Sequence, residues 1–232
     1  MVGMNFDQRP LAKLTFTLLS RRPTAESLTV ALAILLLCFL SSWLYWEKSP
    51  LAPYLAATGQ AVFERGEYWR LITTQWVHGD VQHLLSNSFL LGILGTLVHA
   101  YYGFKIFPWL TLLGSAVMMG VSLHHYEPHV TLVGASGWVY FLAGFWLVLF
   151  FLIERQRSLR SRWIRVLGVG AMILLPSTFQ EQVSYVSHFW GAVGGLVLGL
   201  FYFQFNKFEI RRAEVWEMPS QVEEFPPEED QT

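Results

Sequence analysis

The chain has 232 residues, of which 53% are hydrophobic and 14% are charged. Soluble domains carry about 25% charged residues, so this composition indicates a membrane protein and excludes an ordinary soluble domain. The net charge is −1, and the basic residues form short clusters between apolar segments, which argues against nucleic-acid binding. The single cysteine, Cys38, excludes a disulfide framework within the chain, and no Cys/His spacing typical of structural zinc occurs.

A polar, basic arm, residues 1–27, comes before the first apolar segment and indicates a cytoplasmic arm, with a transit peptide as the alternative. Six spans are predicted, in chain order 28–46, 81–102, 106–123, 133–153, 166–176 and 183–205. The fifth, 166–176, is shorter than the others. The shorter run reaches membrane length only with Trp163 and a snorkelling Arg165. Residues 49–80 mix aromatic and polar side chains, which predicts a structured segment in the membrane interface.

The distribution of positive charge predicts the orientation. Thirteen of the 16 Lys and Arg residues lie in the two terminal segments and in alternate loops. The other three, Lys48, Arg65 and Arg70, lie between the first two spans. By the positive-inside rule, six spans with both termini in the cytoplasm fit this pattern. The tail, residues 206–232, begins basic, becomes acidic and contains proline, which is typical of a solvated, disordered segment.

A serine lies between small residues where a loop becomes an apolar helix. The segment is Gly134-Ala135-Ser136-Gly137. Small neighbours leave the Ser136 hydroxyl approachable, and the unpaired N–H groups of a helix start favour negative charge. Ser136 is therefore a candidate nucleophile. The alternative is that these small residues serve helix packing in the membrane.

His188 is an ionisable residue inside the sixth span, and such residues are functional candidates, although a lone histidine can also serve packing. Glycines recur every fourth residue on its helix face: Gly191, Gly195 and Gly199. This stripe allows close approach of the fourth span, which has its own small residues at 143–144. We expect the contact to bring Ser136 and His188 within hydrogen-bond reach, with Tyr140 packed against the imidazole. Because no Asp or Glu lies within a span, the expected mechanism uses a Ser–His dyad.

His83 and Asn87 lie four residues apart, hence on one face of the second span, and both side chains can donate hydrogen bonds. The predicted orientation places them on the outer side, at the depth of Ser136. With the backbone N–H of Ser136 they could form an oxyanion hole for a tetrahedral intermediate. For Asn87, an interhelical hydrogen bond is the alternative.

Together and in this order, the motifs resemble those of the rhomboid intramembrane serine proteases. The matching residues are Glu67-Tyr68-Trp69-Arg70, His78, His83-x-x-x-Asn87, Gly134-Ala135-Ser136-Gly137 with Tyr140, and His188-x-x-Gly191-x-x-x-Gly195. The resemblance covers residues 28–205. It implies an all-α membrane protein, a six-transmembrane-helix bundle that cleaves transmembrane substrates with Ser136 and His188, with His83 and Asn87 at the oxyanion. Ser187 and Thr74 depart from residues common in the family, and neither departure removes a catalytic group.

Two further groups of residues are weaker candidates for a functional role. Trp69 and Arg70 are expected to be structural, with the guanidinium bound to backbone carbonyls and the indole at the interface. A histidine-rich loop could hold a metal ion, with His124, His125, Glu127 and His129 as ligands. Pro128 and the exposed position of this loop favour solvated side chains instead, so neither a metal nor a cofactor is expected.

The sequence thus favours an intramembrane serine endopeptidase whose domain spans 28–205. A non-catalytic membrane scaffold of the same fold and a rhombosortase-like processing protease remain open. A transporter is disfavoured, because no internal repeat occurs. The expected partners are single-span transmembrane substrates and the lipid bilayer, and the resemblance implies a multi-pass protein of a bacterial inner membrane.

Overall fold

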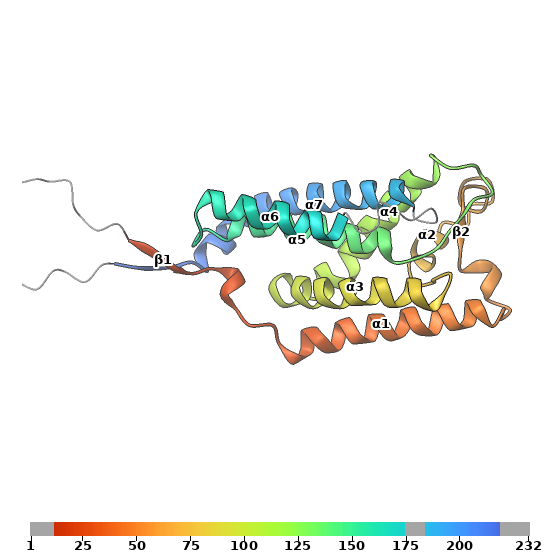
Figure 1. Cartoon of the computed structure of the whole chain (residues 1–232), viewed down its shortest axis with the longest axis horizontal. Helices are drawn as coiled ribbons and strands as arrows, with labels where there is room; N and C mark the ends of the chain where they lie inside the picture. The colour runs from red at the N-terminus through yellow and green to blue at the C-terminus, as the bar shows by residue number, and fades with distance from the viewer. Residues whose placement is uncertain (1–11, 175–183, 219–232) are drawn as a thin grey trace, which may run out of the picture.

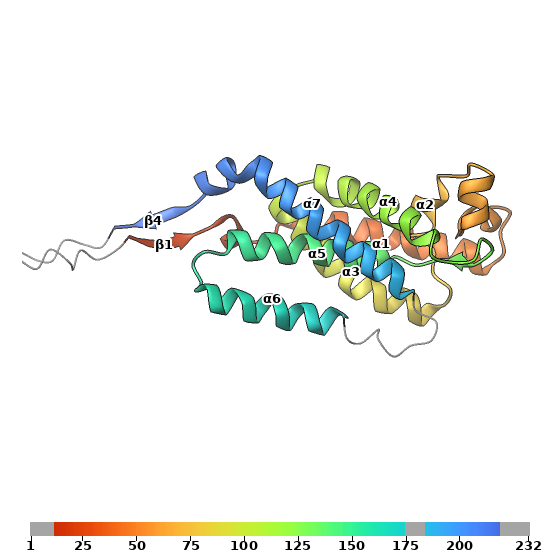
Figure 2. The same cartoon turned by 90° about the horizontal axis from the view of Figure 1, so that it is seen from above.

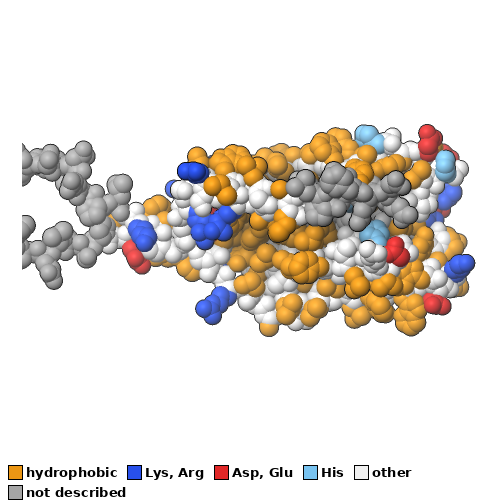
Figure 3. Space-filling view, viewed as in Figure 1, with side chains coloured by type: hydrophobic (Ala, Val, Ile, Leu, Met, Phe, Trp, Pro, Cys, Tyr) orange, Lys and Arg blue, Asp and Glu red, His pale blue; other side chains and the backbone are white. Residues whose placement is uncertain are grey.

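The computed structural model describes residues 12–174 and 184–218 and is mostly helical (Figure 1). Among these described residues, five helices are long and apolar enough to cross a membrane. They are α1 (Ala25–Trp46), α3 (Val81–Tyr102), Lys105–Leu123, α5 (Ser136–Ile153) and α7 (Tyr185–Arg212). Apolar side chains cover the length of the visible face of the bundle, and charged side chains gather toward its two ends (Figure 3). This confirms the predicted all-α membrane bundle.

The third of these helices consists of two parts. A first turn, η4 (Lys105–Leu110), joins α4 (Thr111–Leu123) across a kink at Phe107, whose backbone is extended (φ −115°, ψ 126°). The residue before a proline is disfavoured in the helical region, so Pro108 explains the kink. The predicted start at residue 106 therefore falls inside this kinked turn.

Helix α6 (Leu159–Leu174) occupies the place of the predicted fifth span but begins earlier, and it is shorter than the five spanning helices. Its start lies in the basic cluster, where Arg162 donates to the carbonyl oxygen of Phe151 and its guanidinium lies over the Phe151 ring. The predicted end at 176 lies outside the described residues. Figure 2 shows α6 at the side of the bundle, and within the described chain it packs extensively only against α5.

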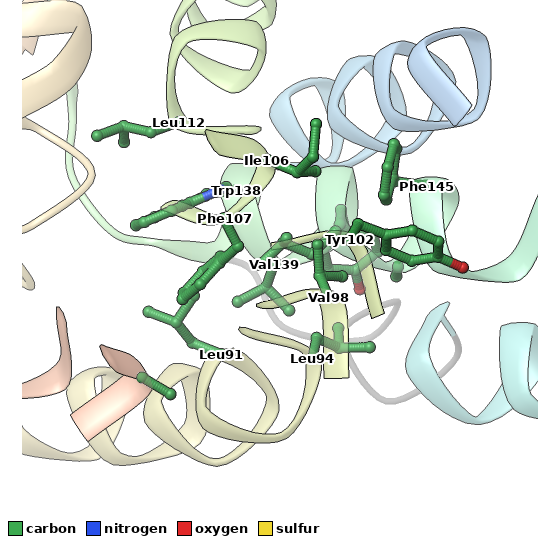
Figure 4. Packing of buried hydrophobic residues seen from close by; sticks show 14 of the residues in the cluster. Leu91, Leu94, Val98, Tyr102, Ile106, Phe107, Leu112, Trp138, Val139 and Phe145 are labelled. Atoms are coloured by element: carbon green, nitrogen blue, oxygen red, sulfur yellow. The ribbon is translucent and has the colours of Figure 1, made fainter. Parts of the chain in front are cut away.

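Helix α5 is the centre of the bundle and contacts α3, α4, α6 and α7. Its Trp138 is fully buried, stacks on Phe107 with 5.6 Å between ring centroids, and donates from Nε1 to Thr111 Oγ1 (3.1 Å). Figure 4 shows this pair on one side of the cluster and the rings of Tyr102 and Phe145 on the other. The rings fix how far α5 can slide along α3 and α4, and this sets the depth of the residues at its first turn.

One end of the bundle, here called the connection end, carries the segment between α1 and α3 (Figure 1). It contains η2 (Ala52–Tyr54), β2 (Ala57–Thr58), η3 (Gln60–Glu64) and α2 (Arg70–Thr73), so it is a structured segment as predicted. Strand β2 pairs antiparallel with β3 (Thr131–Leu132), which lies just before α5. The buried Arg70 donates to Glu67 and to the carbonyl oxygens of Pro53 and Ala56, while Trp69 is half exposed at the surface.

Helix α1 ends at the connection end in an unusual way. The N–H of Ser49 donates to the carbonyl oxygen of Leu44 and the N–H of Lys48 to that of Tyr45, which is the pattern of a Schellman cap. Lys48 has φ +51°, the left-handed region that this cap requires and that glycine occupies at lowest cost. Lys48 is the one non-glycine residue with positive φ in the described chain, and this conformation costs about 1–2 kcal/mol.

The opposite end, here called the strand-pair end, joins the two ends of the described chain. Strand β1 (Lys13–Phe16) pairs antiparallel with β4 (Val215–Glu217). The structure therefore differs from the predicted disordered tail beginning at residue 206. Helix α7 continues to Arg212. Glu214 forms ion pairs with Arg155 and Arg211, which anchor the start of β4.

Candidate active site

The largest helix contact of the bundle joins α5 and α7, and it is made by glycines. A Cβ atom at Gly191 would collide with the carbonyl oxygen of Gly137, and one at Gly195 with that of Phe141. On the other helix, a Cβ atom at Gly144 would collide with the carbonyl oxygen of Ala192. The two backbones are thus in direct contact, which is the role that small residues have in membrane helix pairs.

This contact aligns the first turns of the two helices. Ser136 is the first residue of α5, and His188 lies in the first turn of α7. The imidazole of His188 stacks on the Tyr140 ring, with centroids 4.0 Å apart and planes 11° from parallel. Both ring nitrogens of His188 are buried and make no hydrogen bond with any described residue, so none joins them to Ser136. Catalytic hydrogen bonds often shorten only when substrate binds.

The loop before Ser136 lies directly against α3. Gly134 has φ +122°, and a Cβ atom there would lie 2.6 Å from Cε1 and 2.8 Å from Nε2 of His83. The same atom would lie 3.7 Å from Nδ2 of Asn87, a buried nitrogen with no hydrogen-bond partner among the described residues. Only glycine satisfies both the backbone angle and this close approach. Two possible donors, His83 and Asn87, therefore face the loop that leads to Ser136.

Residues 74–78 hold this loop in place. The Thr74 hydroxyl donates to the carbonyl oxygen of Leu132, and the Thr74 carbonyl oxygen accepts from the N–H of Gly134 (3.0 Å). Next along the loop, the N–H of Ala135 donates to His78 Nε2 (3.2 Å). The sequence alone indicates no role for Thr74 beyond its departure from the family pattern, because these bonds join residues far apart in the chain.

A family model of the rhomboid domain matches residues 65–205, which is more than half of the chain. The chain belongs to the rhomboid family.

Three similar relatives illustrate the range of the family. The chain is 27% identical over 182 residues to "Rhomboid protease GluP" of Bacillus subtilis, covering 78% of this chain and 34% of that protein. It is 28% identical over 153 residues to "RHOMBOID-like protein 5" of Arabidopsis thaliana, covering 65% and 49%. It is 33% identical over 149 residues to "Rhomboid-related protein 1" of Caenorhabditis elegans, covering 58% and 40%. The matches therefore span less than half the length of each of these three relatives.

In this rhomboid protein, His78 is held as a neutral imidazole. Because Nε2 accepts from Ala135, the neutral ring carries its proton on Nδ1, which lies 3.2 Å from Ser42 Oγ. Ser42 Oγ accepts from the His78 backbone N–H and donates to the carbonyl oxygen of Trp76. Burial, reinforced by the neighbouring His83, lowers the pKa of His78 to about 3.

The other residues singled out in the sequence lie apart from this site. The guanidinium of Arg70 donates to two backbone carbonyl oxygens of the connection. Its partner Glu67 also pairs with Arg65, and these guanidinium contacts lower the pKa of the Glu67 carboxyl. His124 stacks on Phe63, and within residues 12–174 and 184–218 no group of three His, Cys, Asp or Glu side chains could hold a metal ion.

Proposed function

We propose that this rhomboid protein is an intramembrane serine endopeptidase in which Ser136 is the nucleophile and His188 the general base. The observation that carries the proposal is the His188–Tyr140 stack on the glycine contact between α5 and α7. The stack fixes the plane of an imidazole whose nitrogens are not engaged by the described residues. Tyr140 thereby takes the orienting part that a carboxylate has in a serine triad.

The reaction would proceed by acyl transfer. Ser136 Oγ attacks the carbonyl carbon of the scissile amide while a ring nitrogen of His188 takes the hydroxyl proton. His188 then gives this proton to the leaving amine, and water hydrolyses the acyl-enzyme with the same histidine as base. The negative oxygen of each tetrahedral intermediate would lie among His83, Asn87 and the backbone N–H of Ser136, beside Gly134.

The proposed substrate is a single-span membrane protein cut near the outer end of its helix. An amide within an intact helix is hydrogen-bonded and shielded, so Ser136 can attack only after local unwinding. Gly, Pro or polar residues in the substrate make unwinding easier, and a small residue before the cut would suit a narrow pocket beside the buried Ala135. We place lateral access beside α6, which packs extensively only against α5 among the described elements.

We propose that the connection end, which carries the candidate site, faces the outside, with both termini in the cytoplasm of a bacterial inner membrane. Three of the 16 Lys and Arg residues lie in the 47–80 connection on that side, and the other 13 belong to the terminal segments and alternate loops of the sequence. The catalytic domain would be 28–205, flanked by the arm 1–27 and the acidic tail 206–232.

The test uses the full chain purified in detergent, with a generic transmembrane substrate and a fluorophosphonate that labels activated serines. The wild type should cleave and be labelled, and Ser136→Ala and His188→Ala should each abolish cleavage. Because the two residues act as a unit, the double variant should be no worse than either single one. Ser86→Ala removes an exposed hydroxyl from α3 and should leave cleavage unchanged.

Other results would assign other functions. A folded wild type that is neither labelled nor cleaves any substrate would be a non-catalytic scaffold. Cleavage restricted to C-terminal sorting tails would make it a rhombosortase-like processing protease. Substantial cleavage by Ser136→Ala would refute the serine mechanism.

A further inference from the structure

A cavity of about 460 Å³ lies at the connection end, where α1 turns into the following segment. None of the candidate catalytic residues lines it. Its lining residues are Tyr45, Trp46, Lys48, Ser49, Ala52 and Pro53. The cavity thus combines two aromatic side chains with a single cation, and the neighbouring carboxylate of Glu47 does not line it.

Lys48 differs from the other basic residues on this side of the bundle. Arg65 and Arg70 both form ion pairs with Glu67. Lys48 forms no ion pair with any residue in the described part of the chain. The connection end therefore presents one lysine ammonium whose charge no carboxylate of the described residues balances.

Lys48 occupies a backbone position that favours glycine, a residue without a side chain. The Schellman cap of α1 places this residue at φ +51°, where glycine is the usual occupant. The two cap hydrogen bonds fix the backbone, so the direction in which the lysine leaves it is also fixed. A strained residue beside a cavity is an observation from which a functional role can be inferred.

The depth of the cavity limits what can fill it. Helix α1 has 22 residues, which span about 33 Å, slightly more than the roughly 30 Å hydrocarbon core of a bilayer. The cavity at its end then lies at the level of the lipid headgroups. Trp46, whose indole donates to the carbonyl oxygen of His78 (2.8 Å), and Tyr45 belong to the aromatic belt found at this depth.

We propose that this cavity binds the headgroup of a phospholipid in the leaflet at the connection end, with the Lys48 ammonium paired to the phosphodiester. Lysine binds phosphate as a point charge, and a charge-assisted hydrogen bond is stronger than one between neutral groups. Tyr45 and Trp46 then contact the glycerol and the first part of the acyl chains.

The test is native mass spectrometry of the full chain released from micelles containing phosphatidylglycerol at increasing concentration. Lys48→Asn keeps a residue that tolerates positive φ but removes the charge, and it should weaken the tightest lipid-binding step about tenfold. Lys48→Arg should retain binding. Lys207→Asn removes an exposed cation from α7 near the strand-pair end and should leave this step unchanged.

Several results would overturn the proposal. One is unchanged lipid binding in Lys48→Asn, and another is an equal loss in Lys207→Asn, which would indicate general charge attraction. Competition by inorganic phosphate at the same concentration would identify a site for the free anion, and equal competition by diacylglycerol would identify a merely apolar groove. If Lys48→Asn fails to fold, Lys48→Gly, which the cap favours, gives the same comparison.

Discussion

The first turn of α5 and the neighbouring helix α6 are held in the molecule by very different means. The loop before Ser136 is tied by the β2–β3 pair, by Thr74 and by His78, and α5 itself is in backbone contact with α7. Helix α6 has extensive contact only with α5 among the described elements, and Leu167 and Met172 are exposed on its surface. The position of the candidate active site is thus fixed by several independent contacts, while the proposed access side depends on one helix contact.

The largest effect is expected from His83 and Asn87, the two possible donors that face the loop before Ser136. Asn87→Ala should lower turnover by about 10²–10³ with little change in substrate binding, because an oxyanion donor acts chiefly in the transition state. Steady-state cleavage measured in detergent separates kcat from KM. Gln82→Ala, an exposed residue on the preceding turn of α3, is the control. Loss of binding with unchanged turnover would instead make Asn87 a packing or recognition residue.

Glycine substitutions in α7 and in α6 test how firmly each helix is packed. Gly195→Ala places a Cβ atom against the carbonyl oxygen of Phe141, which cannot move unless α5 shifts, so we expect a loss of about 1–3 kcal/mol or more in unfolding free energy. Gly168→Ala in α6 meets nothing within 4 Å and should be neutral or stabilise by up to about 1 kcal/mol. Thermal unfolding in micelles measures both. Equal losses would show that α6 is packed as firmly as α7.

His78, which holds the loop before Ser136, should also make the stability of the protein depend on pH. Below about pH 6.5 the unfolded chain protonates His78, while the folded chain, with a pKa of about 3, does not. The unfolded state then binds more protons, so the free energy of unfolding decreases as the pH is lowered from about 6.5 to 3, by up to about 1.4 kcal/mol per pH unit. His78→Gln should flatten the profile measured by unfolding in detergent, and His125→Gln, on an exposed loop, should not. An unchanged profile in His78→Gln would show that another group causes the dependence.

A smaller effect is expected where the two regions meet. The Tyr140 hydroxyl donates to the carbonyl oxygen of Ile173 in α6 (3.1 Å), while its ring carries the His188 stack. Tyr140→Phe keeps the stack and removes this bond, at a cost of about 1 kcal/mol. Hydrogen exchange in α6 should become faster while cleavage continues, whereas Tyr140→Ala should also reduce cleavage. Slower exchange in Tyr140→Phe would contradict this division of roles.

Much of the fold could be predicted because its signals are local. Hydropathy located the long spans, and the glycine spacing of α7 anticipated its contact with α5, since both patterns lie within single helices. The start of α6 was predicted too late, because Arg160 and Arg162 conceal a helix from hydropathy. The bonds from Thr74 and His78 to residues 132–135 could not be predicted, because they depend on backbone groups that only the folded bundle brings together.

The pairing of β1 with β4 has a consequence for how the protein is made. The two strands are about 200 residues apart, and Lys13 lies opposite Glu217. During translation β1 leaves the ribosome early, and its partner is synthesised only after every helix of the bundle. Until then β1 is an unpaired edge, a state that invites association with other chains. Pairing of β1 with β4 therefore reports that the whole bundle has been synthesised, and a chain truncated before β4 would keep an unpaired strand at the strand-pair end.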